Sequence, residues 1–389
     1  KEVDKILNSS GIAFAEIGKP IDERRLDIKR KKEQFSFSIN EMRDIWYETS
    51  YLLDCKQSGE KCARERFENY KKQPLKFNFN YSPQITQINT NNISENECNL
   101  WQNGKIISEN QRTKNRPIAA IIREKGTNGE REMAYSLYLA GFEVKDVTMT
   151  DLATGRETLE NVNFIIFCGG FSNSDVLGSA KGWAGVFLYN EKAKTALENF
   201  YRRPDTLSLG ICNGCQLMVE LANSPQNPPI GGLGVVQTDN AVPFLPLWEK
   251  LGGGFMLHND SHKFESEFIS VEIPQNNSVM FCSLSGSKLG IWVAHGEGKF
   301  HLPQPETDYN IVAKYTYEGY PANPNGSDYN TAGICSADGR HLAMMPHLER
   351  AIFPWQWAHY PADRKKIDKV TAWVEAFENA RKWIEKKLS

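Results

Sequence analysis

The segment LSLGICNGCQLMVEL, residues 207–221, constrains this chain more than any other. It begins with apolar residues typical of a buried strand, passes through Cys212 into small residues, and continues in a helical pattern that opens near Gln216. Small residues at 210 and 214 permit a strained strand-to-helix turn, and the N-terminus of the following helix stabilises a thiolate. The segment therefore predicts a nucleophile elbow with Cys212 as the attacking group.

The pattern from residue 116 onward is that of an α/β domain. Short apolar segments alternate with amphipathic helical segments, and after residue 230 they give way to strands rich in β-branched and aromatic residues. We expect an open, mostly parallel sheet with helices on both faces and extra β-strands in the C-terminal half. The predicted strands are 117–122, 142–149, 163–168, 207–211, 265–273, 289–294, 310–317 and 333–345, and the predicted helices are 129–141, 151–160, 192–203, 213–222 and 363–388.

The first part of the chain differs from this pattern. Residues 1–76 are charged and predict a small N-terminal helical appendage. Within it, EMRDIWYETSYLLD places Met42, Ile45, Trp46, Tyr51 and Leu52 near one helical face, as in a small packed element. Residues 77–115 contain ten asparagines and few aliphatic residues, which is typical of a linker or an irregular surface wrap. We therefore divide the chain into 1–76, 77–115 and 116–389.

Composition excludes several classes of function. The 46 Lys and Arg against 48 Asp and Glu leave a net charge of −2, which provides no field for gripping nucleic acid. No apolar run approaches the roughly 18 residues of a membrane helix, and the first residues lack a signal peptide. We therefore expect a cytoplasmic protein without nucleic-acid or membrane partners. Because the chain begins at Lys1, we expect it to be processed or to be a piece of a longer polypeptide.

A nucleophilic cysteine needs a base, and His347 is the best placed of seven histidines. It follows an apolar strand in AMMPHLER, and Glu349 lies two residues further on, where a carboxylate can orient the imidazole. In NFIIFCGGFSNSD another apolar strand leads to Gly169 and Gly170. This turn is consistent with an oxyanion hole and equally with a tight turn that needs positive φ.

Other interpretations of Cys212 compete with a nucleophile. Cys212 and Cys215 form a CxxC pair, which also occurs in zinc sites and redox dithiols, and a cysteine at a strand end is often merely buried. A structural zinc site needs a second such pair or two histidines at ligand spacing, and we find neither. We expect no metal site and mostly reduced cysteines.

Six motifs together resemble one family. GICNGCQ, CGGFSNSDVLG, RPIAAIIREKGTNGEREMA, AHGEGKF, YPANPNGS and MMPHLER are similar, in order and spacing, to the glutaminase domain of large single-chain formylglycinamide ribonucleotide amidotransferases, a class I glutamine amidotransferase. The resemblance runs from about Arg116 to the C-terminus. The segment EMRDIWYETSYLLD resembles the tail of the ATP-dependent synthetase part of the same proteins.

The resemblance implies specific roles. Cys212 matches the nucleophile, His347 the general base and acid, and Glu349 the third member of the triad, while Gly170 and the N–H of Asn213 match the oxyanion donors. It implies a Cys-dependent glutaminase that forms a γ-glutamyl thioester and supplies ammonia for purine biosynthesis. The family's glutamine-binding positions correspond to Gly169, Gln216, Asn259, His295, Gly296 and Glu297, and Ser261 falls in the same family loop as Asn259.

The chain departs from the family at two motifs. SNSD stands where SYGD is usual, and HLE stands where HPE is usual, so that both catalytic residues are kept. No GxxxxGK[ST] motif occurs, and we expect no cofactor in this chain, with ATP and Mg²⁺ bound by the synthetase part of the same polypeptide. Two alternatives remain: another cysteine hydrolase of the same fold, and a non-catalytic docking module with a redox-active Cys pair.

Overall fold

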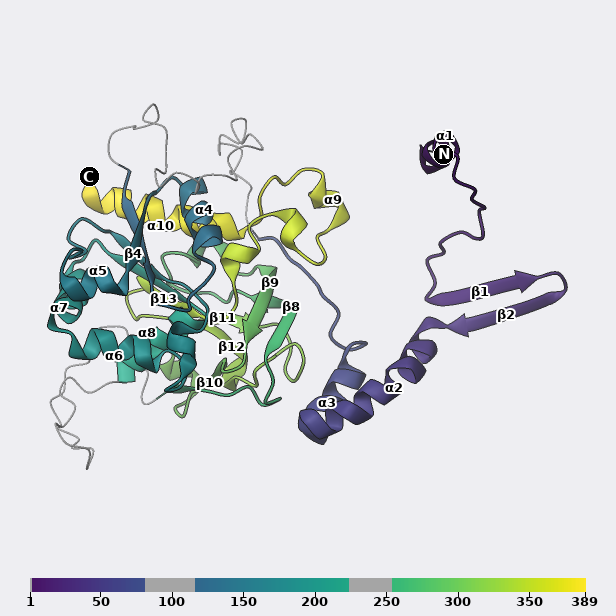
Figure 1. Cartoon of the computed structure of the whole chain (residues 1–389), viewed down its shortest axis with the longest axis horizontal. Coiled ribbons are helices and arrows are strands. Elements are labelled where there is room, and N and C mark those ends of the chain that lie inside the picture. The colour runs from purple at the N-terminus through teal and green to yellow at the C-terminus, as the bar shows by residue number, and fades with distance from the viewer. Residues whose placement is uncertain (1, 81–115, 224–253) are drawn as a thin grey trace.

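The computed structural model describes residues 2–80, 116–223 and 254–389. These residues form a domain and a projecting arm, which we define as residues 2–76 (Figure 1). Much of the predicted linker, residues 81–115, lies outside the described residues, and the division of the chain at residues 76 and 115 stays a prediction. Within the described ranges, no helix is both long and apolar enough to cross a membrane.

A nine-stranded sheet runs through the domain in the order β4-β3-β5-β6-β13-β12-β11-β8-β9. The strands from β4 to β13 are parallel, and those from β13 to β9 are antiparallel. A short ribbon pairs β7 (Phe255–Leu257) with β10 (Lys299–His301). The strands of the main sheet are β3 (Ile118–Arg123), β4 (Glu143–Thr148), β5 (Phe164–Phe167), β6 (Leu207–Ile211), β8 (Glu265–Glu272), β9 (Lys288–His295), β11 (Ile311–Tyr315), β12 (Thr331–Cys335) and β13 (His341–Met344).

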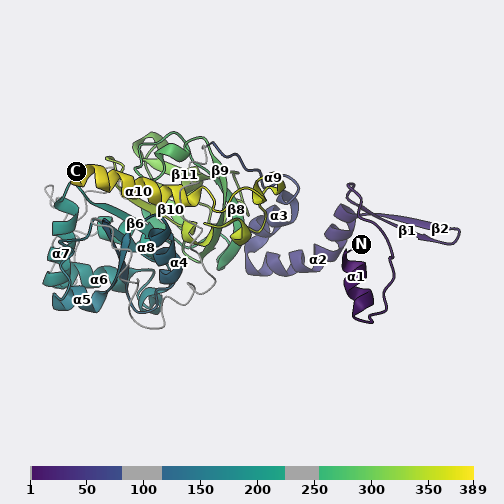
Figure 2. The ribbon, with the colours of Figure 1, turned by 90° about the horizontal axis from the view of Figure 1, so that it is seen from above.

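Helices cover both faces of the parallel half, as the sequence predicts (Figures 1 and 2). On one face, α4 (Glu130–Leu139) packs beside α10 (Trp373–Leu388). Strands β5 and β6 are buried along their whole length between the two helical layers, which explains their continuous apolar sequences. The opposite face carries α5 (Met149–Thr154), α6 (Lys181–Tyr189), α7 (Glu191–Arg202) and α8 (Asn213–Asn223).

Three helical segments differ from the predictions. Helix α5 is shorter because Gly155 ends it in the left-handed conformation, with φ of 77°. The predicted terminal helix is broken into α9 (Ala362–Lys365) and α10, since Thr371 turns its backbone N–H to Ile352 and accepts a hydrogen bond from the N–H of Trp373. Helix α6 was not predicted, because two glycines interrupt its apolar pattern.

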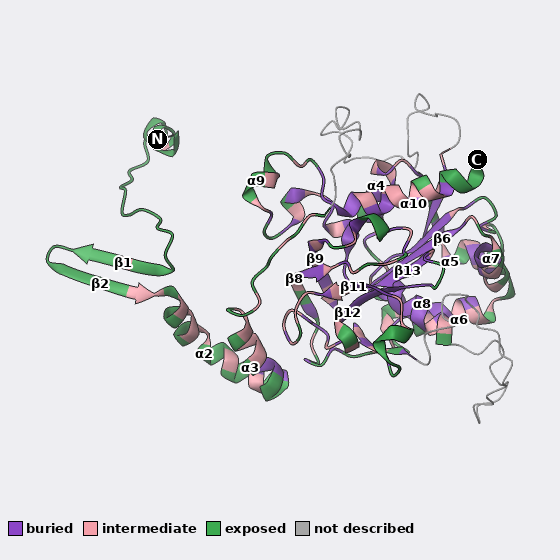
Figure 3. Ribbon diagram, turned by 180° about the vertical axis from the view of Figure 1, so that it is seen from behind, coloured by how far each residue is buried: buried purple, intermediate pink, exposed green. Residues whose placement is uncertain are grey.

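The arm contains more than helices. It consists of α1 (Glu2–Ser9), the hairpin β1 (Arg25–Arg30) and β2 (Glu33–Ser38), α2 (Ile39–Gln57) and α3 (Gly59–Asn69). The prediction of a packed apolar face on α2 is wrong: Ile45 and Trp46 are 65% and 77% exposed, and Met42 and Leu52 are exposed as well. Helix α3 covers the side of α2 that carries Tyr51, and the β1–β2 hairpin also contacts α2. The arm is therefore largely green in Figure 3, whereas the sheet is purple.

The chain attaches to the domain directly after the arm. Asn78 forms an antiparallel bridge with Lys288 on the edge strand β9. The rings of Phe77 and Phe79 pack against Trp357, with centroids 5.1 and 6.1 Å away. The first residues of the predicted linker thus lie on the domain surface and cover the edge of the sheet.

Candidate active site

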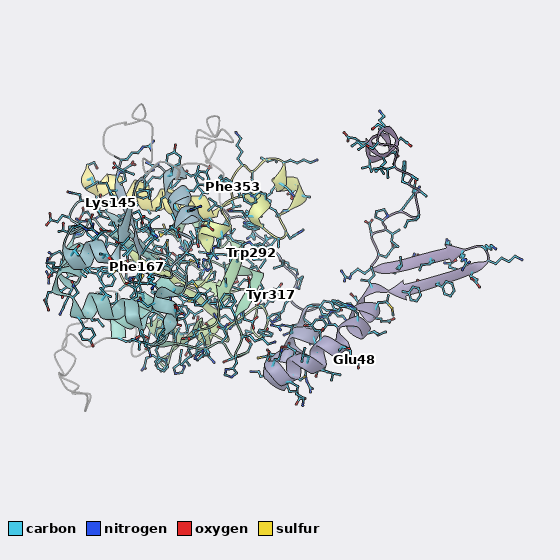
Figure 4. The ribbon with its side chains drawn as sticks, in the orientation of Figure 1. Glu48, Lys145, Phe167, Trp292, Tyr317 and Phe353 are labelled. Carbon is cyan, nitrogen blue, oxygen red and sulfur yellow. The ribbon has the colours of Figure 1, made fainter. Side chains whose placement is uncertain are left out.

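Three neighbouring parallel strands end at one place. Strand β6 lies between β5 and β13, and the segments that follow these strands carry Gly169, Cys212 and His347. Carboxyl ends of parallel strands share one edge of a sheet, so the topology brings these residues together. Figure 4 marks Phe167, the last residue of β5, in the middle of the domain.

Cys212 occupies a strained turn, as the sequence predicts. Its φ is 54°, a region that residues other than glycine rarely adopt, and its N–H donates to the carbonyl of Met344 at 3.0 Å. A β-carbon at Gly210 would lie 2.5 Å from the carbonyl oxygen of Gly214, and one at Gly214 would lie 2.0 Å from that of Phe167. Only glycine fits at both positions, and α8 begins at once after the cysteine.

His347 and Glu349 form a buried pair. Their Nδ1 and Oε1 atoms are 2.6 Å apart, and both side chains are 2% exposed. Burial works to lower the pKa of His347, but the charge of Glu349 and the nearby Cys212 thiol outweigh it and raise the pKa to about 9. The site therefore favours the imidazolium form of His347 at neutral pH.

Gly169 lies between Cys212 and His347. A β-carbon there would be 2.9 Å from Cε1 of His347 and 3.2 Å from Cβ of Cys212, so any side chain would push the two apart. Nε2 of His347 is buried and has no hydrogen-bond partner among the described residues. It is therefore available to exchange a proton with a reacting group.

A loop that we did not assign to the site holds the Gly169–Gly170 turn. Gly170, with φ of 128°, forms a bridge to Thr127, in which the N–H of Asn128 donates to the carbonyl of Gly169. A β-carbon at Gly126 would lie 2.1 Å from the carbonyl oxygen of Phe171. The hydrogen bonds of this bridge do not use the N–H of Gly170. The sequence signal was the pair of glycines in KGTNG, which both have positive φ.

Strand β9, in the antiparallel half of the sheet, bends back, contacts both His347 and Cys212, and so forms a wall of the site. Although β9 is the far edge strand, the N–H of His347 donates to the carbonyl of Trp292 at 2.8 Å. Next along β9, the carbonyl of Ala294 accepts from Sγ of Cys212 at 3.4 Å. Burial and the charge of His347 lower the pKa of His295 to about 3. Within the part of the chain that the structure describes, its buried Nε2 has no hydrogen-bond partner. His295 therefore enters the site as a neutral ring.

Gln216 joins the elbow to this wall. Its Nε2 donates to the carbonyl of Glu297 at 2.6 Å, and its Oε1 accepts from Nδ2 of Asn213 at 2.9 Å. Oδ1 of Asn213 in turn accepts the N–H of Ser172 at 3.0 Å. The side chain of Asn213 was missed as a positioning group because we considered only its backbone N–H. These hydrogen bonds connect the predicted glutamine-binding residues Gln216 and Glu297 to the segment that follows the Gly169–Gly170 turn.

Asn259 forms hydrogen bonds to the segment 295–298, which begins at the end of β9. It is fully buried, and its Nδ2 donates to the carbonyls of His295 and Lys263 at 2.7 and 2.9 Å. Its Oδ1 accepts the N–H of Gly298 at 3.0 Å and lies 3.2 Å from Nδ1 of His295. The backbone N–H of Asn259 donates a hydrogen bond to the carbonyl of Gly296. Asn259 therefore shapes the segment 295–298 through its backbone.

The two departures from the family motifs have different structural contexts. In SNSD, Asn173, Ser174 and Asp175 all adopt positive φ, between 50° and 57°. A serine thus stands in a left-handed conformation where the resembling motif has glycine. In HLE, Leu348 is fully buried in the core, and His347 and Glu349 still pair.

Among the residues that the structure describes, no group of three or more His, Cys, Asp or Glu side chains is placed to hold a metal ion. Cys212 and Cys215 are both free thiols. Cys215 is fully buried, and burial raises its pKa well above the usual value. Thus the two cysteines of the CxxC pair differ sharply in environment.

Comparisons with known proteins identify a family and relatives for this chain. Residues 116–384 match the CobB/CobQ-like glutamine amidotransferase domain family. The chain is 39% identical over 383 residues to the probable phosphoribosylformylglycinamidine synthase, chloroplastic/mitochondrial, of Arabidopsis thaliana, covering 94% of this chain and 24% of the relative. It is 38% identical over 358 residues to the human phosphoribosylformylglycinamidine synthase, covering 89% of this chain and 25% of the relative.

The chain thus spans about a quarter of the length of these curated relatives. A solved structure, that of PurLQS from Thermotoga maritima, is 23% identical, with a TM-score of 0.49, and covers 71% of this chain and 100% of that one. The family match covers the whole sheet and every residue of the site described above. The chain therefore belongs to the CobB/CobQ-like glutamine amidotransferase domain family.

Proposed function

We propose that this domain hydrolyses glutamine to glutamate and ammonia through a Cys212–His347–Glu349 triad. The observation that carries the proposal is the convergence of Cys212 and His347 at the ends of β6 and β13, with Glu349 paired to the imidazole at 2.6 Å. The raised pKa of His347 supports an imidazolium, the form that can donate a proton to a leaving group, at neutral pH. The match to the CobB/CobQ-like glutamine amidotransferase domain family supports the choice of glutamine over other amides.

The reaction proceeds in two steps. The Cys212 thiolate attacks the side-chain amide carbon of glutamine, and the N–H groups of Gly170 and Asn213 stabilise the oxyanion. His347 gives its proton to the leaving nitrogen, ammonia departs, and a γ-glutamyl thioester remains on the sulfur. The neutral His347 then takes a proton from water, whose oxygen attacks the thioester, so that glutamate and the thiolate are released.

Glutamine lies in the proposed pocket between the elbow and the segment 295–298. Gln216, His295, Gly296 and Glu297 line it, with Gly169 between the reacting residues. Asn259 contributes by holding the backbone of this segment, since all its side-chain hydrogen-bonding groups are engaged within the protein.

The ammonia serves a synthetase part of the same polypeptide. There it converts formylglycinamide ribonucleotide to formylglycinamidine ribonucleotide in purine biosynthesis, with ATP and Mg²⁺ bound by the synthetase part. The names of the two relatives, both phosphoribosylformylglycinamidine synthases, and their roughly fourfold greater length support this step. We place the reaction in the cytoplasm.

The test uses the complete protein with Cys212→Ala and His347→Ala. Both variants should lose glutamine hydrolysis and glutamine-dependent synthesis but keep synthesis with added ammonia, because only the ammonia source is removed. Cys215→Ala is the matched control and should hydrolyse glutamine normally. Retained glutaminase turnover in the Cys212 or the His347 variant would refute the triad.

A further inference from the structure

Four charged side chains join the arm to the wall of the glutamine pocket. We call them the clamp: Asp54 and Arg66 from the arm, and Lys263 and Glu265 from the domain. Arg66 donates from Nη1 to Oδ2 of Asp54 and from Nη2 to Oε2 of Glu265, both at 3.1 Å. Nζ of Lys263 donates to Oδ1 of Asp54. The charges of two carboxylates and two cations thus cancel at the contact between the arm and the domain.

The arm side of the clamp is built around Asp54. This residue is 5% exposed, and its Oδ1 also accepts from Oγ of Ser58 at 2.8 Å. Burial works to raise the pKa of Asp54, but hydrogen bonds from Lys263 and Ser58 and the charge of Arg66 outweigh it and lower the pKa. Asp54 therefore stays charged, and removal of a partner leaves a buried charge uncompensated.

The domain side is built around Glu265, at the start of β8. This residue is also 5% exposed, and its Oε1 accepts from the hydroxyls of Tyr320, at 2.9 Å, and Ser261. The guanidinium of Arg66 lies 4.6 Å from the centre of the Tyr320 ring. Arg66 is therefore held on two sides, by charge and by an aromatic face.

The clamp residues of the domain lie on the turn that carries Asn259. The carbonyl of Lys263 accepts from Nδ2 of Asn259, and the same Nδ2 donates to the carbonyl of His295. Beyond His295, the carbonyl of Glu297 holds Gln216. A continuous series of hydrogen bonds and ion pairs therefore runs from Arg66 to the residues that line the glutamine pocket.

We propose that Arg66 is a positioning residue for glutamine binding: through Glu265 and Asp54 it fixes the turn 259–265, and through Asn259 it fixes the pocket wall 295–298. This inference rests on the proposed function. Arg66 does not touch the substrate, and its effect is to set how well the wall is formed before glutamine arrives.

The test measures glutamine hydrolysis by the complete protein with Arg66→Met, Arg66→Lys and Arg64→Met. Arg64 is the matched control, because it lies on the same helix, and its one ion pair among the described residues is with exposed Glu60. Arg66→Met should raise KM for glutamine about tenfold with kcat changed less than about threefold, since uniform substrate binding is lost. Arg66→Lys should recover part of the loss, and Arg64→Met should match the unaltered protein. Thermal melting of each variant checks that it is folded.

The outcomes separate the two proposals. An unchanged KM in a folded Arg66→Met variant, or an equal change in Arg64→Met, overturns the positioning role while the proposed function stands. If Arg66→Met does not fold, Arg66→Lys decides, and an unaltered KM in it overturns the inference. Absence of glutamine hydrolysis by the unaltered protein overturns the proposed function and the inference with it.

Discussion

The domain and the arm use similar amphipathic helices in opposite ways. Helix α10 buries Trp373 completely against the sheet, whereas α2 leaves Trp46 77% exposed. Both helices have an apolar face that the sequence reveals, but α10 packs its face against the sheet, whereas Met42, Ile45, Trp46 and Leu52 of α2 stay exposed among the described residues. An amphipathic pattern therefore predicts a helix and a buried face, and the partner comes from long-range contacts.

The first prediction compares these two tryptophans. Trp373→Ala should lower the free energy of unfolding of the domain by about 3–5 kcal/mol, because it removes a large, fully buried side chain. Trp46→Ala should change it by less than about 0.5 kcal/mol. Chemical denaturation followed by circular dichroism measures both. Equal losses would show that the arm is as much part of the domain core as α10.

The second prediction compares two glycines. Gly214→Ala should destabilise the domain by about 3 kcal/mol, since its β-carbon would collide with the carbonyl of Phe167 beneath the elbow. Gly18→Ala, in the arm, has no atom within 4 Å of the new β-carbon and should be neutral. The melting temperatures of the two variants, each compared with that of the unaltered protein, test this prediction. A stable Gly214→Ala variant would contradict the close packing of α8 on β5.

The third prediction compares a buried carboxylate with an exposed one. The pKa of His347 is raised from 6.5 to about 9, so its ion pairs are complete below pH 6.5 and are lost as the pH rises through about 9. Glu349→Gln should move the alkaline limb of the glutaminase pH profile down by about one unit or more, because the largest contribution that raises this pKa is removed.

Asp44→Asn is the control for that profile. Asp44 pairs with Lys71 on the arm, where both side chains are partly exposed and lie outside the site. The variant should leave the pH profile in place. A profile that Glu349→Gln does not move would contradict the assignment of the alkaline limb to His347.

The smallest expected effect concerns two left-handed residues. Ser174 in the domain and Lys31 in the arm have φ of 57° and 52°. Ser174→Gly should stabilise the domain by about 1 kcal/mol, because glycine adopts this conformation without strain. Lys31→Gly lies in an exposed hairpin and should leave the melting of the domain unchanged. Destabilisation by Ser174→Gly would show that the serine has a specific role in the loop.

The sequence was sufficient for the parts of the site that depend on local pattern. Cys212 and His347 each follow an apolar strand, and neighbouring parallel strands bring such ends together. The wall around Ala294 could not be predicted, because it depends on the curl that returns edge strand β9 to His347. The clamp could not be predicted either, since Arg66 and Glu265 are 199 residues apart.

The most direct test of the central claim is mass-spectrometric mapping of labelling by 6-diazo-5-oxonorleucine, a glutamine analogue that alkylates the nucleophile. The account predicts labelling confined to Cys212 and suppressed by glutamine. Cys168 and Cys215 should stay unlabelled, because burial raises their pKa well above the usual value. If Cys212 reacts readily with iodoacetamide but stays unlabelled by the analogue in the complete protein, the glutamine site is contradicted.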